Sequence, residues 1–358
     1  MSRKHFSWLL FFTFLVAALV LMVPGKTGRE SSIERTVFLP AVGAGVNDIE
    51  WLRLTGPGGV TIATLERRGA AWVVEEASGY RADWGRLKSL LSALSQAEIT
   101  EEKTANPEYY PRLGVEDVSS PEATGVMIEF AGDSGLPTVI LGKNAQGREG
   151  QYARLQDAAE TVLIDRRMDV PVELADWLDQ TVIDISDAEV VEVRINHPDG
   201  ESIKAVKTSA DDTNFILQDI PAGMEVKSDW SVNALAGALA ALNLEYVVPE
   251  DNLAWADVVR YTLLTADGLL IESDLLPIEA SAEAGTDEVA ESKYWLRLQA
   301  GIYTTAVENG LEMAGDDEAA SARAETINDR VRGWAYRIPK YKFDSMSKRK
   351  SDLLQPAE

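Results

Sequence analysis

The chain has 358 residues, enough for two domains with separate cores, and 46% of them are hydrophobic, which excludes wholesale disorder. Its formal net charge of -24 repels nucleic acid and anionic lipid headgroups, so nucleic-acid binding is disfavoured. The absence of cysteine excludes a lipoprotein anchor, disulfides, thiolate metal sites and a cysteine nucleophile.

The N-terminus holds a long apolar stretch, Phe6 to Val23, without a charged residue. As a helix it would span about 27 Å, close to the hydrocarbon core of a bilayer. Arg3 and Lys4 precede it, which predicts a cytoplasmic N-terminus and a translocated bulk. A cleaved signal peptide is the alternative, but it should have a shorter apolar run and a small-x-small site, which Leu21 to Gly25 lacks. We therefore predict a cytoplasmic tip and retained anchor over residues 1–25.

Residues 26–45 contain Gly, Pro, Ser and mixed charges with little periodicity, which is typical of a tether. Folding is predicted to begin at residue 46. Apolar residues alternate on both sides of Gly56-Pro57-Gly58-Gly59, which predicts a hairpin, and Trp72-Val73-Val74 predicts a further strand.

A helix is predicted from Asp83 to Ile99. Its apolar residues have helical spacing, and Asp83 precedes them where a side chain can accept bonds from the first free N–H groups. Later strands are predicted around residues 126–130, 138–141, 151–155 and 161–164, and they complete a first α+β module over residues 46–182.

The same order of elements recurs over residues 183–345. His197-Pro198-Asp199-Gly200 takes the place of the glycine-rich turn, Asp229 to Val247 repeats the helix with its Asp-Trp start, and Tyr294 to Leu298 matches Gln151 to Leu155. Several matches in one order argue for duplication. The sequence thus predicts an α+β fold of two tandem homologous modules, each an antiparallel sheet with one main helix, after an N-terminal transmembrane helix.

The second module differs from the first in two acidic inserts, Glu279 to Glu291 and Glu308 to Glu325, which are expected to be mobile loops. The aromatic and basic stretch from Trp334 to Phe343 is either an interface or a closing element packed on the module, and we favour the second interpretation. Residues 346–358 are expected to form a tail.

The chain resembles the bacterial envelope family called domain of unknown function 4340 (DUF4340). The resemblance is carried by the apolar N-terminus, the strand before Gly56, the Trp-Val-Val strand, the leucine-rich helix, Leu141-Gly142-Lys143 and Tyr152 to Leu155. Where that family usually has Tyr-Gly-Leu after the helix, this chain has Tyr110-Pro111-Arg112-Leu113-Gly114. The resemblance implies an extracytoplasmic protein associated with ABC-transporter components of the gliding-motility type, and it brings no catalytic residues.

Catalytic and metal-binding motifs do not emerge from the sequence. The two histidines, His5 and His197, are expected on opposite sides of the membrane, and His197 is expected to be a solvated turn residue. The glycine-rich turn joins two strands and opens no helix, so it is no phosphate loop. Asp316-Asp317-Glu318 and Asp211-Asp212 lack the ligand spacing of a calcium loop, and helix capping explains Asp83 and Asp229. We assign no catalytic, cofactor-binding or metal-binding residue and expect no cofactor.

These features favour a non-enzymatic, membrane-anchored binding or scaffolding protein with an integral-membrane or envelope protein as its partner. We expect a single pass through the bacterial inner membrane and a periplasmic C-terminal bulk. Two alternatives stay open. A carboxylate-dependent envelope hydrolase requires two carboxyls facing each other across a cleft, one with a raised pKa. A small-ligand or lipid-binding module requires a deep apolar pocket between sheet and helix.

Overall fold

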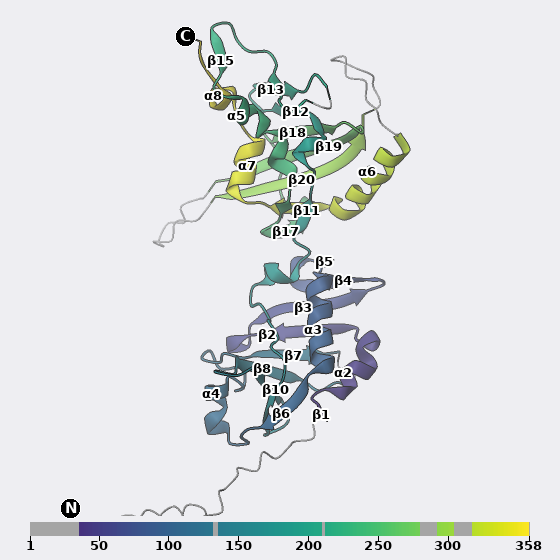
Figure 1. Ribbon diagram of the computed structural model, residues 1–358, viewed down its shortest axis with the longest axis vertical. Coiled ribbons are helices and arrows are strands. Elements are labelled where there is room, and N and C mark those ends of the chain that lie inside the picture. Colours follow the sequence, from purple (N-terminus) through teal and green to yellow (C-terminus); the bar gives the residue numbers. More distant parts are fainter. Residues whose placement is uncertain (1–35, 132–134, 210–211, 280–291, 304–316, 358) are drawn as a thin grey trace, which may run out of the picture. The chain divides into compact units, whose positions relative to one another are not determined.

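The computed structural model describes residues 36–131, 135–209, 212–279, 292–303 and 317–357. The fold is mixed α+β with two large antiparallel sheets of ten and eight strands (Figure 1). By its internal contacts the chain divides into two compact units. One holds Leu54–Thr61, Ser89–Val170 and the chain before Glu50, and the other holds Glu50–Arg53, Ile62–Lys88 and Pro171–Glu358.

The first sheet has the strand order β1-β6-β10-β9-β8-β7-β2-β3-β4-β5. The predicted turn at Gly56 to Gly59 connects β2 to β3, where Gly58 and Gly59 have positive φ angles, as glycine in tight turns permits. Its strands are β1 (Thr36–Val37), β2 (Trp51–Thr55), β3 (Thr61–Arg68), β4 (Ala71–Val74), β5 (Tyr80–Arg81), β6 (Glu98–Glu102), β7 (Val126–Phe130), β8 (Val139–Asn144), β9 (Gln151–Leu155) and β10 (Thr161–Ile164).

The main helix of this part, α3 (Trp84–Gln96), forms where the leucine spacing predicts it, but it ends before the predicted Ile99, because Glu98 and Ile99 belong to strand β6. Its apolar stripe is buried, and each buried leucine contributes roughly 2 kcal/mol through loss of apolar surface from water. The Asp83 carboxylate accepts a 3.0 Å hydrogen bond from the Arg86 amide and caps the first turn, as expected. The stripe residues are Leu87, Leu90, Leu91 and Leu94.

Residues 36–45, predicted as the end of a tether, are instead folded. β1 pairs with β6, Thr36 opposite Ile99, and the short helix α2 (Pro40–Gly45) follows. The reason is burial, because Leu39 and Val42 are almost fully removed from solvent.

The second sheet has the order β14-β13-β12-β18-β19-β20-β21-β17. When the strands of each sheet are numbered along the chain, this order is the same as β4-β3-β2-β7-β8-β9-β10-β6 in the first sheet. The second sheet lacks counterparts of β1 and β5. Its strands are β12 (Val190–Asn196), β13 (Ser202–Val206), β14 (Ile216–Leu217), β17 (Tyr246–Pro249), β18 (Val259–Thr265), β19 (Leu269–Ile278), β20 (Lys293–Ile302) and β21 (Trp334–Arg337).

The second main helix is not the continuous helix that the sequence predicts. α5 (Asp229–Asn233) ends after one turn, a 3-10 turn covers Ala236–Leu239, and the chain is extended from β16 (Leu242–Asn243) onward. Ala241, between these parts, has a φ of 44°, which is incompatible with a right-handed helix. Ser228 and not Asp229 caps α5, because the Ser228 side chain accepts the bond from the Ser231 amide.

The acidic insert predicted at Glu308 to Glu325 is partly helical, because α6 (Asp317–Val331) begins within it. Burial explains this correction, since Ala320 and Ala324 turn one face of α6 into the core. The rest of this insert before Asp317, and nearly all of the insert at Glu279 to Glu291, lie outside the described residues.

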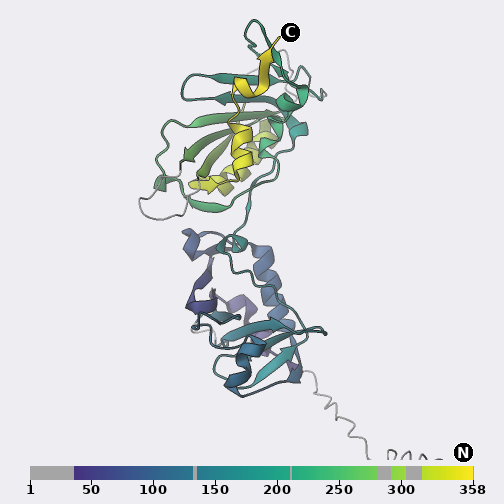
Figure 2. The ribbon, with the colours of Figure 1, turned by 90° about the vertical axis from the view of Figure 1, so that its left-hand side faces the viewer.

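The C-terminal residues, predicted as a tail from 346 onward, are packed on the second sheet's part of the chain. α7 (Lys340–Met346) is followed by α8 (Lys350–Leu353) and by β22 (Leu354–Pro356), which pairs with β15 (Met224–Val226), as Figure 2 shows. Leu353 and Leu354 are buried, which holds this segment in place. A separate small sheet joins β11 (Thr181–Ile183) to β16.

In the described part of the chain, no helix has both the length and the apolar character needed to cross a bilayer. The predicted anchor, Phe6 to Val23, lies outside the described residues, as does His5.

Candidate functional site

Each sheet carries an arginine at a corresponding position of one strand. Arg154 on β9 pairs across the sheet with Ile140 on β8, and Arg297 on β20 pairs with Asp274 on β19. β9 and β20 have the same place in the strand order, and both arginines precede a leucine. The two faces around these arginines can therefore be compared position by position.

In the first sheet this face is covered by residues 103–125, here called the covering segment. The segment contains the short helix α4 (Tyr110–Leu113), and its Tyr110, Val115 and Val118 form an apolar cluster with Ile140. The buried Arg154 donates a 2.9 Å bond to the Val115 carbonyl and lies 4.8 Å from the centre of the Tyr110 ring. The guanidinium is thereby satisfied under the segment.

Gly142 on β8 shows how closely the covering segment approaches. A Cβ added at Gly142 would lie 2.4 Å from the Leu113 carbonyl oxygen and 2.7 Å from a Val115 methyl group. No side chain fits there without displacing backbone. In the second sheet the equivalent residue is Leu276, which lies two positions after the cross-strand partner of Arg297, as Gly142 lies two positions after that of Arg154.

The second sheet has only residues 250–258 between β17 and β18, where the first sheet has the covering segment between β6 and β7. The corresponding face, here called the open face, is polar, and its Arg260 and Gln299 are exposed. It consists of Arg260 and Thr262 on β18, Glu272 and Asp274 on β19, and Arg297 and Gln299 on β20.

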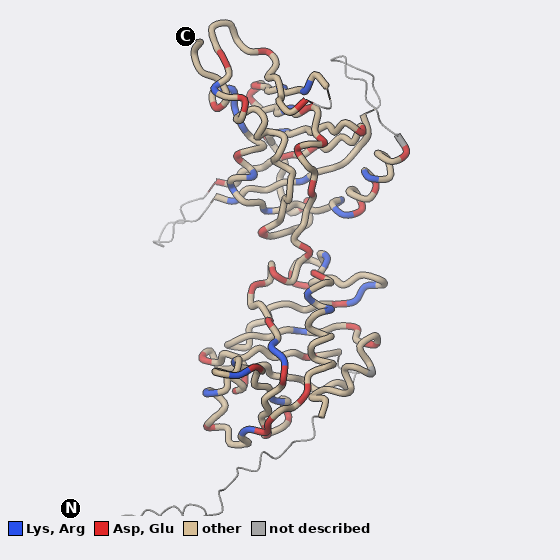
Figure 3. Tube along the Cα trace, viewed as in Figure 1, with Lys and Arg blue, Asp and Glu red and all other residues tan. Residues whose placement is uncertain are grey.

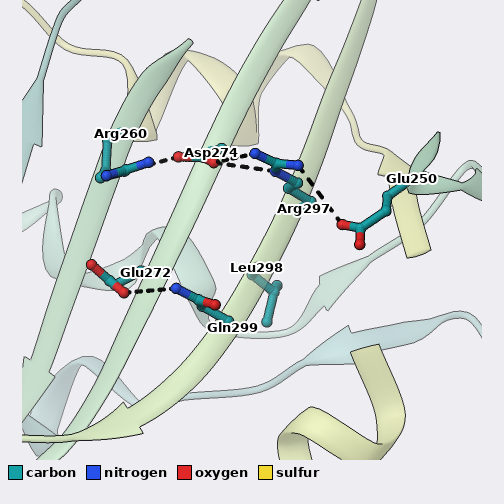
Figure 4. Close-up of a pocket in the computed structure, with 7 residues that line it drawn as sticks. All are labelled: Glu250, Arg260, Glu272, Asp274, Arg297, Leu298 and Gln299. Carbon is teal, nitrogen blue, oxygen red and sulfur yellow. Dashed lines mark hydrogen bonds and ion pairs between the residues drawn. The ribbon is translucent and has the colours of Figure 1, made fainter. Parts of the chain in front are cut away.

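A pocket of about 330 Å³ lies on the open face (Figure 4). Asp274 is at its centre and accepts a 2.9 Å bond from Arg260 on one side and a 3.0 Å bond from Arg297 on the other. A second row joins Gln299 to Glu272 at 2.8 Å. The full lining is Glu250, Arg260, Glu272, Asp274, Arg297, Leu298 and Gln299.

Arg297 is held from three sides. Besides Asp274 it faces the Glu250 carboxylate at 3.9 Å, and its guanidinium lies 4.7 Å from the centre of the Trp255 ring. Trp255 is in turn fixed by a 2.9 Å bond from its indole N–H to the Glu250 carbonyl. A preorganised arginine against an aromatic ring loses little side-chain entropy on binding, so the arrangement suits recognition.

The electrostatics of this pocket favour recognition over acid–base chemistry. Asp274 accepts hydrogen bonds from an arginine on each side, and its bond with Arg260 raises the pKa of that guanidinium. These ion pairs are partly exposed, and each contributes at most about 1 kcal/mol to stability. Figure 3 shows acidic and basic residues interspersed over this part of the chain, and the pocket itself has three carboxylates against two guanidinium groups.

Over residues 72–259 the chain matches the family described as Domain of unknown function (DUF4340). The chain belongs to this family. Curated proteins and solved structures give no match. The DUF4340 region runs from β4 through α3 and the covering segment to the first residue of β18, so Arg260 and the open-face residues of β19 and β20 follow it.

His197 lies within the DUF4340 region, and its expected solvation is wrong. The ring is buried, and Nε2 lies 3.0 Å from the Lys348 carbonyl. The C-terminal segment causes this burial, since Arg349 bonds Asp199 and Glu201 at 2.8 Å beside the histidine. The hydrogen bond from the Lys350 amide is the main cause that lowers the pKa of the Glu201 carboxyl, and the bond from Arg349 lowers it further.

The remaining candidates from the sequence are not brought together in one site. Asp83 caps α3, Asp229 lies in the first turn of α5, and Asp212 accepts a bond from the Ser209 amide. Asp211 and Asp316 are outside the described residues. Among the residues that the structure describes, no group of three His, Cys, Asp or Glu side chains could hold a metal ion.

The aromatic stretch from Trp334 to Phe343 packs as a closing element. Tyr336 in β21 and Phe343 in α7 are buried, whereas Tyr341 is exposed. In the strand order, the counterpart of β21 in the first sheet is β10, because each follows the strand that bears the arginine.

No catalytic or metal-binding motif marks the open face, but the spacing of polar residues in its strands does indicate it. Two charged or polar residues stand two positions apart in each of β18, β19 and β20, and a spacing of two places both on one face of a strand. The aligned positions in β7 and β8 are Met127 and Ile140, where the covering segment lies.

Proposed function

We propose that this chain is a membrane-anchored, extracytoplasmic binding or scaffolding protein, an auxiliary subunit of an ABC-transporter-like envelope complex of the gliding-motility type. The open face of the second sheet is its contact surface for an integral-membrane or envelope partner. One observation carries the proposal: the chain covers this face in its first sheet with its own residues, whereas in its second sheet the described residues leave a pocket there.

The chemistry of the two faces supports this role. Under the covering segment the strands present Met127 and Ile140, whereas the open face presents Arg260 and Asp274 at the same positions. A polar surface stays soluble until a partner with complementary charges arrives, and such surfaces give specificity and fast association. Arg297 on its Trp255 platform is the residue best held for a central contact.

The proposed location rests on the sequence. The uncharged stretch from Phe6 to Val23 with Arg3 and Lys4 before it favours a single pass through the bacterial inner membrane and a periplasmic bulk. An anchor confines the folded parts near a membrane partner and raises their effective concentration there.

We further propose that the two sheets belong to tandem homologous modules that arose by duplication. The shared order of eight strands supports this, as does the arginine–leucine pair at Arg154 and Arg297 on equivalent strands. After duplication one copy keeps the covering segment, and the other is free to bind a separate protein.

The alternative of a carboxylate-dependent hydrolase has less support. It needs a carboxyl with a raised pKa, and every displaced carboxyl pKa among the described residues is lowered, as at Glu201 and Asp267. A small-ligand-binding role is favoured by a second pocket, which is lined by Lys207 and Phe215.

Because the chain lacks cysteine, single-cysteine cross-linking tests the proposal without background. Gln299→Cys places a thiol on the open face, and Ala322→Cys places one on the exposed surface of α6 as a matched control. Each full-length variant is expressed in its native membrane, labelled with a photoreactive maleimide, irradiated and analysed by mass spectrometry. A parallel set carries an unrelated anchor in place of Phe6 to Val23.

We expect Gln299→Cys, with either anchor, to capture the same integral-membrane or envelope protein at least tenfold above the Ala322→Cys control. Capture only with the native anchor would move the contact into the bilayer. Equal capture from both positions, or no partner above background, would exclude the open face as the contact surface.

A further inference from the structure

A second pocket, of about 340 Å³, lies at the other side of the second sheet's part of the chain, next to the edge strand β14. It is built where the 3-10 turn Asp187–Glu189, the end of β13 and the helix α5 meet. Its volume is at the lower end of the roughly 300–1,000 Å³ typical of small-ligand sites. The lining residues are Asp187, Ala188, Lys207, Asp212, Thr213, Phe215 and Asn233.

Lys207 is the unusual member of this lining. Its side chain is charged, yet the residue is only 3% exposed. Within the described residues the ammonium has one hydrogen bond, 3.5 Å long, to the Ala188 carbonyl, and it lies 5.0 Å from the centre of the Phe215 ring. An ammonium group has three donors, and leaving donors unsatisfied in a buried place costs free energy. Lys207 is therefore poised to donate to an oxygen atom in the pocket.

The other polar groups divide into occupied and available ones. Asn233 is occupied, because its Oδ1 accepts the Phe215 amide and its Nδ2 donates to Asn214, each at 2.8 Å. Asp212 accepts the Ser209 amide at 2.9 Å and a bond from the Thr208 hydroxyl. Within the described residues, the side chains of Asp187 and Thr213 have no partner.

The charges select the kind of ligand. Two carboxylates, Asp187 and Asp212, face one ammonium, and the pKa of Asp212 is lowered by its bonds from Thr208 and Ser209, so that it stays ionised. An anion entering this pocket would meet a net negative lining, and a cation would meet the buried ammonium. A neutral molecule with hydroxyl groups can accept from Lys207 and donate to a carboxylate at once.

We infer that this pocket binds a neutral, hydroxyl-rich ligand of about one sugar ring, with Lys207 donating to a ring or hydroxyl oxygen, Asp187 accepting a hydroxyl proton and Phe215 forming the apolar wall. The site is independent of the contact proposed for the open face, since the two pockets share no lining residue. In the described part of the first sheet the position of Lys207 is taken by Arg67, which is exposed.

The test is ligand-observed saturation-transfer NMR on the full-length protein in detergent, with glucose and N-acetylglucosamine as sugar probes and inorganic phosphate as the anion probe, the last followed by ³¹P line broadening. Lys207→Met removes the ammonium but keeps the apolar stem. Lys204→Met is the matched control, because Lys204 lies in β13, the strand that ends just before Lys207, and lines neither pocket.

We expect transfer to at least one sugar probe, a Kd raised at least tenfold by Lys207→Met and unchanged in Lys204→Met, and no phosphate binding. Asp187→Asn is a second variant at an exposed position, expected to weaken sugar binding severalfold without affecting folding. Absence of transfer to both sugars, transfer that survives Lys207→Met unchanged, or preferential phosphate binding would overturn the inference.

Discussion

Two buried basic side chains, Arg154 and Lys342, donate to main-chain carbonyls. Arg154 donates to the carbonyls of Val115, Leu155, Gln156 and Ala158, and Lys342 donates to those of Ala238 and Ala240 at the end of the 3-10 turn that follows α5. Removing such a donor leaves several acceptors unpaired.

Arg154→Ala is expected to lower the free energy of unfolding by about 3 kcal/mol, because four carbonyls lose their donor and the Tyr110 ring loses its stacked partner. Urea unfolding followed by circular dichroism measures the change. Arg148→Ala is the control, since Arg148 is half-exposed and pairs with Glu101 at the surface, so its loss should cost less than about 1 kcal/mol. Equal losses for the two variants would contradict this account of Arg154.

Lys342 gives a pH dependence with a defined sign. Burial lowers the pKa of its ammonium below the ordinary value of 10.5, so above the lowered pKa the unfolded chain binds more protons than the folded chain. The penalty of the buried charge is full below the lowered pKa and fades as pH rises toward 10.5. Wild type should therefore gain stability relative to Lys342→Met between pH 7.5 and pH 10 in urea titrations, and a constant difference would refute it.

At the scale of the element, a glycine can mark a place where two segments approach too closely for a side chain to fit. Gly142 in β8 is required by the covering segment, while Gly237 in the 3-10 turn after α5 has open space around its Cβ position and no positive φ. Glycine therefore has different roles at these two positions: in β8 it permits a close approach of two segments, and in the 3-10 turn it only adds conformational freedom to the unfolded chain.

Gly142→Ala is expected to destabilise the protein by about 2 kcal/mol, because the added methyl meets backbone oxygen at 2.4 Å and pushes the covering segment off β8. Gly237→Ala is expected to stabilise it by roughly 0.5–1 kcal/mol, because the unfolded chain loses freedom and nothing clashes. Thermal and urea unfolding of both variants decides the matter. Changes of the same sign would mean that the close approach at Gly142 does not govern stability.

At the scale of the whole molecule, two sheets of one topology differ in what lies on them. The first has β1 at its edge and the covering segment on its face, whereas among the described residues the second has neither, and a pocket lies on its polar face. The acidic charge of the chain keeps such a surface soluble and steers it away from anionic lipid. Family membership is consistent with this organisation and adds no chemistry of its own.

Removing residues 1–25 tests the proposed anchor. The full chain should remain in the membrane pellet after an alkaline carbonate wash, whereas the shortened chain should be released with an unchanged circular dichroism spectrum from its folded parts. Intact mass of the membrane form provides the control for cleavage. Release of the full chain, or a mature mass lacking the apolar stretch, would favour the signal-peptide alternative.

Local patterns in the sequence determined a good part of this protein. Leucines at helical spacing after Asp83 predicted α3, and turn residues at Gly56 and His197 predicted the hairpins. The repeated order of strands predicted two similar sheets. These features depend on neighbours along the chain or on a period of two or three to four residues, which a sequence displays directly.

Tertiary structure alone decided the rest. Burial of Leu39 folded the end of the expected tether, the C-terminal segment buried His197, and the break at Ala241 divided the second helix. The open face and the Lys207 pocket likewise arise from residues far apart in sequence whose proximity depends on strand pairing and on which segments cover them. Such contacts are set by long-range packing, which residue spacing does not encode.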